Sequence, residues 1–374
     1  MQLSEIIIEK IRKSGPLSFR DFMEMCLYYP GTGYYTSSRE KIGINGDYYT
    51  SPDTGTVFGA MLGRQFEEMW QLTGKKGFTI VEYGAGKGLL SHDILEFLSS
   101  NTELYSRLTY FIIEKSPELR EQQKKYLKDK VQWIDSVHDI PAFTGCVFSN
   151  EVVDNFSVHR VVMQDVLMEV FVNYNGKFIE ILRPADKKLT DYLSELNVIL
   201  PDGFCTEINL EATEWIKEIA CRLKKGFVLT IDYGSPSSDL YVSGRNGGTL
   251  LCYYKHTIND QPYTNIGEQD ITSHVNFSAL THWGTMYGLD TCGLTKQGNL
   301  LMAMGFDDYL RQILLQERDM YRNFKQYRFL KYTLLLDMGQ RFNVLIQSKN
   351  IRNARLRIFS ETERIAYSHT AISR

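Results

Sequence analysis

A glycine cluster directly after an apolar run is the part of the sequence that most clearly suggests binding chemistry. Residues 79–83 have the pattern of a buried strand with Glu82 near its end, and a helical segment begins near residue 89. Positions without a Cβ let the backbone approach a ligand closely, and the helix directs N–H groups and its positive dipole end at that ligand. We therefore expect a ligand with a negative group at the turn of Gly84, Ala85, Gly86, Lys87 and Gly88. A glycine-rich turn that binds nothing is the alternative.

The spacing of the glycines narrows the choice of ligand. A dinucleotide-binding turn has the pattern G-x-G-x-x-G, whereas here the third glycine comes one residue earlier, as G-x-G-x-G. This turn resembles the first motif of class I S-adenosylmethionine-dependent methyltransferases, in which it holds the methionine end of the cofactor. The same spacing disfavours a nicotinamide-dependent dehydrogenase, for which the sequence also offers no evident His/Lys pair to relay a proton.

Other polar residues also follow apolar runs. Residues 109–113 predict a second strand that ends at Glu114, whose carboxylate could accept hydrogen bonds from ribose hydroxyls. Shorter runs lead into Asp135 and Asn150. Alternating strands and helices predict a mostly parallel sheet flanked by helices, an α/β Rossmann-like fold, in which ligands bind beyond the carboxyl ends of the strands. We expect Glu82, Glu114, Asp135 and Asn150 to share one cofactor site, although a solvated acid at a strand end is the alternative for Glu114 taken alone.

Two acids follow the strand that ends at Asn150. Glu151 and Asp154 are three residues apart and could hold a guanidinium through charge-assisted, fork-like hydrogen bonds. Two carboxylates would also orient one nitrogen for methyl transfer and help remove its proton. The alternative is that they are N-cap and first-turn acids of a helix. His159 could act as a base, but a lone histidine at the start of a strand is more often structural.

Two polar segments outside the strands also suggest binding. Residues 46–52 could close over the cofactor through Asp47, Thr50, Ser51 and Pro52, or form an ordinary surface turn. Residues 267–276 are rich in acids and amides. We expect no metal there, because His274 has no second histidine at helical spacing. An acidic loop that receives a basic substrate, or a cap for a helix that begins at Phe277, fits better.

Composition limits the class of protein. The 374 residues are 43% hydrophobic, with a formal net charge of −3, which does not favour nucleic acid as a partner. Six scattered cysteines include no C-x-x-C pair, so we expect reduced thiols rather than a zinc or redox site. No apolar run is long enough to span a membrane, and the first residues do not have the pattern of a secretory or transit signal. We expect a cytoplasmic protein, or a mitochondrial matrix protein if it is a processed eukaryotic form.

Changes in pattern along the chain suggest its organisation. We expect an N-terminal helical extension over the cofactor site (1–75), an α/β domain (76–349) and a loosely attached tail (350–374). Two insertions interrupt the domain. The first, at about 160–210, is an antiparallel flap with a hairpin at Asn173–Gly176, and the second, at about 235–275, is a long polar loop. Helices are predicted over 299–339, followed by a last strand.

Several runs together resemble the MidA family of class I methyltransferases, in matching order from about Ser18 to Lys349. They are 29–35 (YPGTGYY), 46–52 (GDYYTSP), 82–88 (EYGAGKG), 149–154 (SNEVVD), 231–234 (IDYG), 248–250 (GTL) and 267–277 (GEQDITSHVNF). Family members commonly have FFDALP where residues 152–157 read VVDNFS. Asp154 matches the aspartate of the family pattern, while the apolar residues around it differ and Ser157 stands where the family has proline.

The resemblance implies binding of S-adenosylmethionine and methylation of a protein arginine. The implied substrate is a respiratory complex I subunit or its bacterial counterpart, and a homodimer is possible. A non-catalytic assembly chaperone that keeps the cofactor as a structural ligand is the alternative. Turnover discriminates the two, because a chaperone would release no S-adenosylhomocysteine in the presence of its partner.

Overall fold

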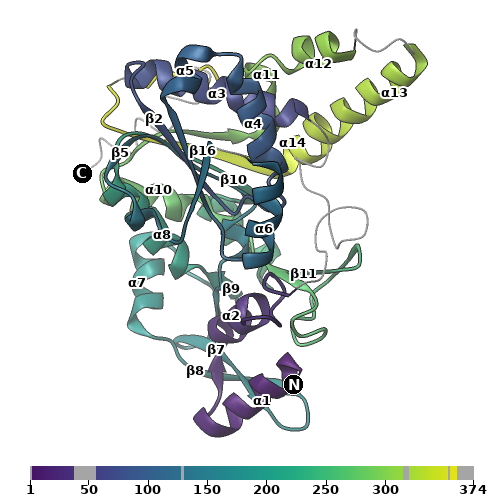
Figure 1. Ribbon diagram of the computed structural model, residues 1–374. Helices are drawn as coiled ribbons and strands as arrows, with labels where there is room; N and C mark the ends of the chain where they lie inside the picture. Colours follow the sequence, from purple (N-terminus) through teal and green to yellow (C-terminus); the bar gives the residue numbers. More distant parts are fainter. Residues whose placement is uncertain (1, 38–55, 128–129, 315–319, 353, 360–374) are drawn as a thin grey trace. The chain divides into compact units, whose positions relative to one another are not determined.

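The computed structural model describes residues 2–37, 56–127, 130–314, 320–352 and 354–359 (Figure 1). The chain forms two compact units, which we describe separately. The first unit comprises Met1–Tyr49, Val152–Ile216 and Gly234–Trp283. The second comprises Thr50–Glu151, Lys217–Tyr233 and Gly284–Arg374. Each unit is therefore built from segments that are distant in the sequence.

The second unit is built on seven strands of an eight-stranded sheet, in the order β15-β16-β10-β5-β2-β3-β4. The eighth strand, β14 (Val275–Asn276), pairs with the end of β10. Its strands are β2 (Phe78–Tyr83), β3 (Leu108–Ile113), β4 (Val131–Ile134), β5 (Phe143–Asn150), β10 (Leu223–Ser235), β15 (Asp290–Lys296) and β16 (Phe342–Lys349). Strands β10, β5, β2, β3 and β4 are parallel, whereas β16 pairs antiparallel with both β10 and β15. The predicted α/β fold with a mostly parallel sheet is confirmed. Strand β15 was not predicted from the sequence.

Helices occupy the connections of this sheet, as the βαβ pattern requires. They are α3 (Thr56–Thr73), α4 (Leu89–Ser99), α5 (Thr102–Arg107), α6 (Pro117–Tyr126), α11 (Gln297–Ala303), α12 (Phe306–Leu314), α13 (Met320–Lys331) and α14 (Met338–Arg341), with a π-helical turn at Tyr332–Asp337. Two further helices, α8 (Leu210–Arg222) and α10 (Phe277–Met286), each include residues of both units. The helices predicted from residue 299 onwards are confirmed as a series of short elements rather than one long helix.

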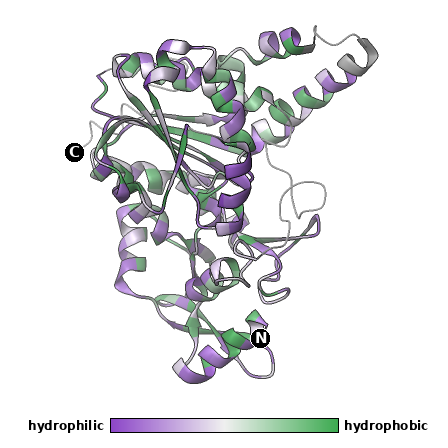
Figure 2. Ribbon diagram, in the orientation of Figure 1, coloured by the Kyte–Doolittle hydropathy of each residue, from purple (hydrophilic) through white to green (hydrophobic). Residues whose placement is uncertain are grey.

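The core of the second unit lies between its sheet and its helices. The central strands are largely hydrophobic (Figure 2), and Ile80, Ile112 and Phe148 are fully buried. Helix α3 packs closely on α4 because Gly59 and Gly63 face it. A Cβ on Gly59 would lie 2.4 Å from the Asp93 Cβ, and one on Gly63 would lie 2.4 Å from the Phe97 ring. These helices can therefore cover the strands without a gap.

The first unit is organised around an antiparallel sheet in the order β1-β7-β6-β9, with β8 also paired to β7. Its elements are α1 (Leu3–Ser14), β1 (Leu17–Ser18), α2 (Phe19–Tyr28), β6 (His159–Met163), β7 (Leu167–Tyr174), β8 (Phe178–Pro184), α7 (Lys187–Glu195) and β9 (Cys205–Ile208). Ser18 caps α2 by accepting a hydrogen bond from the Asp21 N–H at 3.1 Å. The predicted hairpin is present as β7 and β8.

The segment predicted as a long polar loop has regular structure. It contains α9 (Ser237–Leu240), β11 (Leu251–Tyr254), β12 (Thr257–Asn259), β13 (Asp270–Thr272) and β14 (Val275–Asn276). Strands β12, β11 and β13 form a small antiparallel sheet. The prediction of a structureless loop is therefore wrong. These strands are too short for their hydrophobic alternation to stand out in the sequence.

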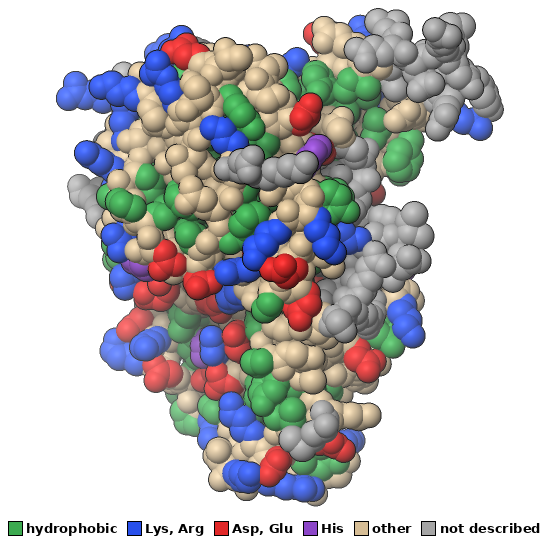
Figure 3. Space-filling model, viewed as in Figure 1, with side chains coloured by type: hydrophobic (Ala, Val, Ile, Leu, Met, Phe, Trp, Pro, Cys, Tyr) green, Lys and Arg blue, Asp and Glu red, His purple; other side chains and the backbone are tan. Residues whose placement is uncertain are grey.

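Part of the predicted loose tail is packed. Ile351, Leu356, Ile358 and Phe359 are buried in the core of the second unit, and residues 360–374 lie outside the described part of the chain. Within the described ranges, no helix is both long and apolar enough to cross a membrane. On the face seen in Figure 3, acidic and basic side chains lie among one another rather than in fields of one sign. The domain division drawn from the sequence stays a prediction.

Candidate active site

The glycine turn of the second unit has the backbone that the sequence predicts. Gly84, Gly86 and Gly88 have φ values of 65°, 55° and 82°. These values lie in the left-handed region, which glycine adopts without strain. The Gly84 N–H donates to the Ile113 carbonyl at 2.9 Å, which ties the turn to the end of β3. Gly88 is the N-cap of α4, so the first turn of that helix begins at the end of the glycine cluster.

Glu82 is a fixed, buried acceptor just before the turn. Its side chain is 2% exposed, and its Oε2 accepts hydrogen bonds from the Ser91 hydroxyl at 2.5 Å and the Tyr110 hydroxyl at 2.7 Å. Burial raises the pKa of Glu82 to about 7, although both hydroxyl donors oppose the rise. The carboxyl group is therefore oriented by neighbours on α4 and β3.

Gln123 joins the glycine turn to Glu114. It was not among the site residues predicted from the sequence. Its Nε2 donates to the Gly86 carbonyl at 2.8 Å and to the Glu114 Oε2 at 3.2 Å, while its Oε1 accepts from the Trp133 Nε1 at 2.7 Å. Gln123 is fully buried on a charged helix. A signal was present, because Leu119, Gln123 and Leu127 follow at intervals of four residues, which places them on one helical face.

Glu114 and Asp135 differ in their surroundings. Glu114 is buried, and its Oε1 accepts from the Ser116 N–H at 3.0 Å. Burial raises the pKa of Glu114, opposed by the hydrogen bonds from Ser116 and Gln123. Asp135 has an 86% exposed side chain and pairs with Arg120 at 2.5 Å. Arg120 also donates to the Glu114 carbonyl at 2.6 Å, so it links the ends of β3 and β4.

Asn150 carries a buried polar atom without a partner. Its Nδ2 donates to the Glu151 Oε1 at 3.0 Å, but its Oδ1 is enclosed and accepts no hydrogen bond from the described residues. The Glu151 N–H donates to the Ile231 carbonyl at 3.0 Å, and Glu151 has a φ of 56°. Left-handed backbone at a residue other than glycine is uncommon and often marks a functional site. A ligand N–H group would satisfy the Asn150 Oδ1.

The strand order brings these predicted residues to one edge of one sheet. The carboxyl ends of β5, β2, β3 and β4 are adjacent, because these four parallel strands are neighbours in that order. Asn150 is the last residue of β5, and Glu82 is the last but one of β2. Glu114 and Asp135 directly follow β3 and β4. The predicted Asp47, Thr50, Ser51 and Pro52 lie outside the described residues. The edge therefore combines left-handed glycines, buried carboxyl groups and an unsatisfied amide oxygen.

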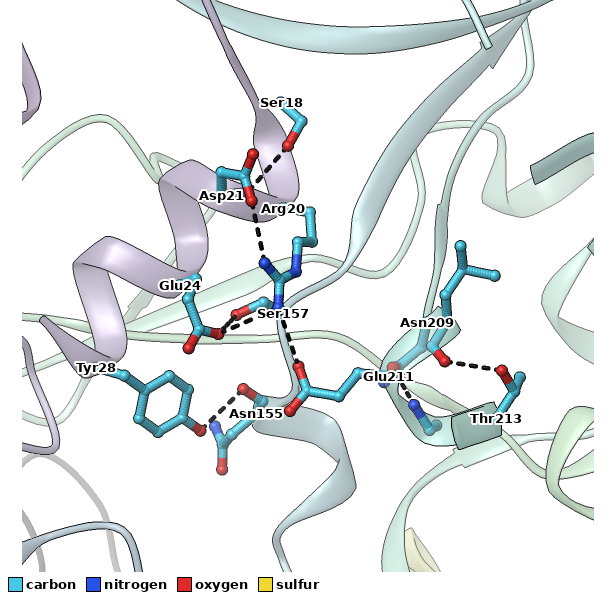
Figure 4. Close-up of polar contacts among 12 residues, drawn as sticks. Ser18, Arg20, Asp21, Glu24, Tyr28, Asn155, Ser157, Asn209, Glu211 and Thr213 are labelled. Atoms are coloured by element: carbon cyan, nitrogen blue, oxygen red, sulfur yellow. Dashed lines mark hydrogen bonds and ion pairs between the residues drawn. The ribbon is translucent and has the colours of Figure 1, made fainter. Parts of the chain in front are cut away.

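Asp154 belongs to the first unit, where contacts from distant parts of the sequence hold its segment. It is 5% exposed, in a short 3-10 helix at Val153–Asn155. Its carbonyl accepts from the Ser273 N–H at 3.0 Å, and the next residue, Asn155, accepts from the Tyr28 hydroxyl at 3.1 Å (Figure 4). The N-cap of the short helix is Val152, which makes no side-chain cap. The N-cap alternative is therefore wrong for Glu151, whereas Asp154 does lie in the first turn of this short helix.

A guanidinium held by carboxylates lies in the same unit, although the sequence reading did not single it out. Arg20 Nη1 contacts Asp21 at 3.0 Å, and its Nη2 lies 3.8 Å from both Glu24 and Glu211 (Figure 4). Glu24 also accepts from the Ser157 hydroxyl at 2.8 Å. These contacts join α2 to the segment after Asp154 and to α8.

The remaining sequence candidates make hydrogen bonds within the described structure. His159 Nδ1 lies 2.6 Å from the Glu169 Oε1 on the neighbouring strand, which fits the structural alternative. Asp270 accepts from the Tyr35 hydroxyl at 2.8 Å and from the Asn155 amide at 3.2 Å. Asn276 accepts from the Ala279 N–H at 3.2 Å and so caps α10, as the capping alternative predicts. The described ranges contain no cluster of His, Cys, Asp or Glu suited to a metal ion.

Comparison with known proteins decides between the ligands that this geometry allows. Residues 61–295 match the family described as S-adenosyl-L-methionine-dependent methyltransferase. The chain belongs to this family. A crystal structure of a Burkholderia thailandensis protein bound to S-adenosyl-homocysteine is 31% identical, covers 98% of this chain and 96% of its own, and superposes with a TM-score of 0.87. The resemblance to MidA-type class I methyltransferases is confirmed.

Two curated relatives are more distant in sequence but similar over most of their length. The Drosophila melanogaster protein arginine methyltransferase NDUFAF7 homolog is 25% identical, over 95% of this chain and 86% of the relative. Protein arginine methyltransferase NDUFAF7 of Homo sapiens is 26% identical, over 90% of this chain and 81% of the relative. Both are named as mitochondrial proteins.

The residues of this methyltransferase fit its cofactor, S-adenosylmethionine. The turn offers left-handed glycines for close backbone approach. Glu114 offers a buried carboxyl group at a strand end, and Asn150 offers an enclosed oxygen that lacks a donor. A nucleoside with hydroxyl groups and an amino acid end supplies a donor for the Asn150 oxygen and further donors for the Glu114 carboxylate.

Proposed function

We propose that this methyltransferase transfers a methyl group from S-adenosylmethionine to a guanidino nitrogen of an arginine in a protein substrate. The substrate we propose is a respiratory complex I subunit or its bacterial counterpart. The names of the curated relatives support arginine as the acceptor. The observation that carries the proposal is the acid pair Glu151 and Asp154, which follows Asn150 closely in the sequence. Glu151 has a left-handed backbone, and the Asp154 carbonyl accepts a hydrogen bond from the Ser273 N–H.

The proposed cofactor contacts lie at the carboxyl ends of strands β5, β2, β3 and β4. Gly84, Ala85, Gly86 and Gly88 would hold the methionine end, and Glu114 would accept hydrogen bonds from the ribose hydroxyls. The Asn150 Oδ1 would accept from the amino group. Glu82 and Gln123 would fix the turn, and exposed Asp135 would border the adenine end. We also propose that Asp47, Thr50, Ser51 and Pro52 close over the cofactor.

The two acids would prepare the acceptor. When bound, S-adenosylmethionine supplies the methyl group on a positively charged sulfur. Carboxylates hold a planar guanidinium through paired hydrogen bonds and draw its positive charge toward themselves, so that the remaining nitrogen keeps a lone pair for attack. A nitrogen–carbon bond then forms as the sulfur–carbon bond breaks. The extra proton of the methylated nitrogen passes to a carboxylate, here Glu151 or Asp154, and then to water.

The substitution Asp154→Asn tests this proposal. We expect methyl transfer to fall by about 100-fold or more, because the amide cannot take a proton or balance the guanidinium charge. Cofactor affinity, measured by calorimetry, should stay within a few-fold of the wild type. Asp165→Asn, a change of an exposed acid in the turn between β6 and β7, is the matched control and should alter neither quantity. Unchanged transfer by Asp154→Asn would show that the carboxylate mechanism is wrong.

A further inference from the structure

The short helix that carries Asp154 is held at three successive carbonyl groups. The carbonyls of Val153, Asp154 and Asn155 each accept a hydrogen bond from a different distant part of the first unit. Their donors are, in that order, the Asn209 amide at 3.2 Å, the Ser273 N–H at 3.0 Å and the Tyr28 hydroxyl at 3.1 Å (Figure 4). A single 3-10 turn cannot satisfy the carbonyls at its own end. These donors therefore fix a backbone that would otherwise be weakly held.

The side chain of Asn155 is held as firmly as its carbonyl. Asn155 is 7% exposed, and its Nδ2 donates to the Asp270 Oδ1 at 3.2 Å. The Asp270 carboxylate is itself oriented on both oxygens, because its Oδ1 accepts from the Ile271 N–H at 2.9 Å and its Oδ2 accepts from the Tyr35 hydroxyl at 2.8 Å. The residue next to Asp154 is thus held at its backbone by Tyr28 and at its side chain by Asp270.

The two tyrosines that reach this segment form a stacked pair. Their ring centroids are 5.5 Å apart, with an angle of 20° between the ring planes. Tyr28 is the last residue of α2, and the turn that follows folds back on the helix, since the Tyr35 N–H donates to the Leu27 carbonyl at 2.8 Å. Gly33 permits this turn, because a Cβ there would lie 2.5 Å from the Tyr29 nitrogen. The pair is therefore fixed before it contacts the Asp154 segment.

The Tyr28 hydroxyl remains a donor over the working pH range. Burial raises the pKa of Tyr28 well above its ordinary value, and carboxylates around it add to the rise. These acids are Glu211, Asp270, Glu24 and Asp154. Removal of the hydroxyl therefore removes one defined hydrogen bond and no charge.

We propose that Tyr28 and Tyr35 are positioning residues for methyl transfer, which act with Asp270 to fix Asn155 and thereby the carboxylate of Asp154. We call these three residues the tyrosine clamp. The inference rests on the proposed function and deepens it, because a carboxylate that holds a guanidinium must keep its place and angle within narrow limits. It also gives a role to the sequence runs 29–35 and 267–277, which the cofactor edge of the sheet does not use.

The substitution Tyr28→Phe tests the clamp, because it keeps the ring and removes only the hydroxyl. With a recombinant complex I subunit as acceptor, we expect kcat to fall about tenfold while KM for the subunit and the affinity for S-adenosylmethionine stay within twofold. In an Asp154→Asn chain the same substitution should cause no further loss, because the hydroxyl acts through Asp154. An equal loss of kcat in both backgrounds would overturn the inference.

Tyr263→Phe is the matched control. It also removes a tyrosine hydroxyl of the first unit that donates to a carboxylate, that of Glu180 at 2.7 Å, as Tyr35→Phe removes the donor to Asp270. We expect Tyr35→Phe to lower kcat severalfold and Tyr263→Phe to leave it unchanged. Circular dichroism checks that each variant is folded. Equal effects of the two substitutions would show that the loss is a general effect of removing a buried hydroxyl, which contradicts the clamp.

A second readout needs no turnover. Hydrogen exchange of the Ser273 amide, followed by NMR, reports whether the Asp154 carbonyl keeps its place. Exchange should be about tenfold faster in Tyr28→Phe than in the wild type, and unchanged at the Cys205 amide, which bonds to the Asn246 carbonyl elsewhere in the unit. Unchanged exchange at Ser273 would overturn the inference. Faster exchange in a chain that methylates no arginine would remove the proposed function, while the clamp itself would stand.

Discussion

The two units hold their candidate site residues in different ways. In the second unit, the polar groups lie at the ends of neighbouring strands and are fixed by contacts of shorter sequence separation, as Ser91 fixes Glu82 across nine residues and Gln123 fixes Gly86 across 37. In the first unit, the segment of Asp154 is fixed by Tyr28 and Asp270, whose contacts with Asn155 span 127 and 115 residues. The edge of the sheet is thus held by neighbouring strand–helix units, whereas the segment of Asp154 is held by parts of the chain that are far apart in sequence.

This difference has a consequence for mutations. A change at the glycine turn should affect cofactor binding while the first unit keeps its structure. A change at Asp154 should affect transfer while cofactor affinity persists. Variants that fail to separate in this way would contradict the distinct roles of the glycine turn and Asp154.

The largest expected effect is at the glycine turn. Gly84→Val places a β-branched residue at a φ of 65°, which distorts the turn. We expect no detectable binding of S-adenosylmethionine by calorimetry. Gly176→Val is the matched control, because Gly176 has a φ of 73° in the β7–β8 hairpin of the first unit with no atom near its missing Cβ. It strains the backbone similarly and should leave binding intact. Loss of binding in both variants would point to general misfolding.

The next effect concerns the buried Glu82 and is a change of stability with pH. The folded protein keeps the Glu82 proton until about pH 7, whereas the unfolded chain loses it near pH 4.5. Relative to Glu82→Gln, the wild type should therefore lose stability as the pH rises from 4.5 to 7, by up to about 3 kcal/mol. Urea unfolding of both proteins across this range, without cofactor, gives the difference. A difference that does not vary with pH would show that Glu82 ionises normally.

The smallest expected effect is at Gln123, which supports the turn without belonging to it. Gln123→Ala removes the bonds to Gly86 and Glu114, so the affinity for S-adenosylmethionine should fall by about tenfold. Gln122→Ala changes the exposed neighbour on the same helix and should have no effect on affinity. If Gln123→Ala and Gln122→Ala bind S-adenosylmethionine with equal affinity, then the hydrogen bonds of Gln123 do not contribute to cofactor binding.

The sequence predicted the features that depend on local pattern. The strands around Glu82, Glu114 and Asn150 have clear apolar runs, and the parallel order follows from the alternation of strands and helices. Gln123 was missed because a buried glutamine on a charged helix is visible only through its spacing from Leu119 and Leu127. The strands between residues 251 and 276 were missed because they are short and gain stability from pairing with each other. The contacts of Tyr28 and Asp270 could not be predicted, since they join segments more than a hundred residues apart.

The most direct test of the central claim is turnover with a protein acceptor. The wild-type chain is incubated with S-adenosylmethionine and recombinant complex I subunits, and the S-adenosylhomocysteine released and the methylarginine formed are both measured by mass spectrometry. We predict one S-adenosylhomocysteine for each methyl group found on arginine, and neither product with Gly84→Val. Tight binding of cofactor and subunit without S-adenosylhomocysteine would contradict arginine methylation and favour an assembly chaperone.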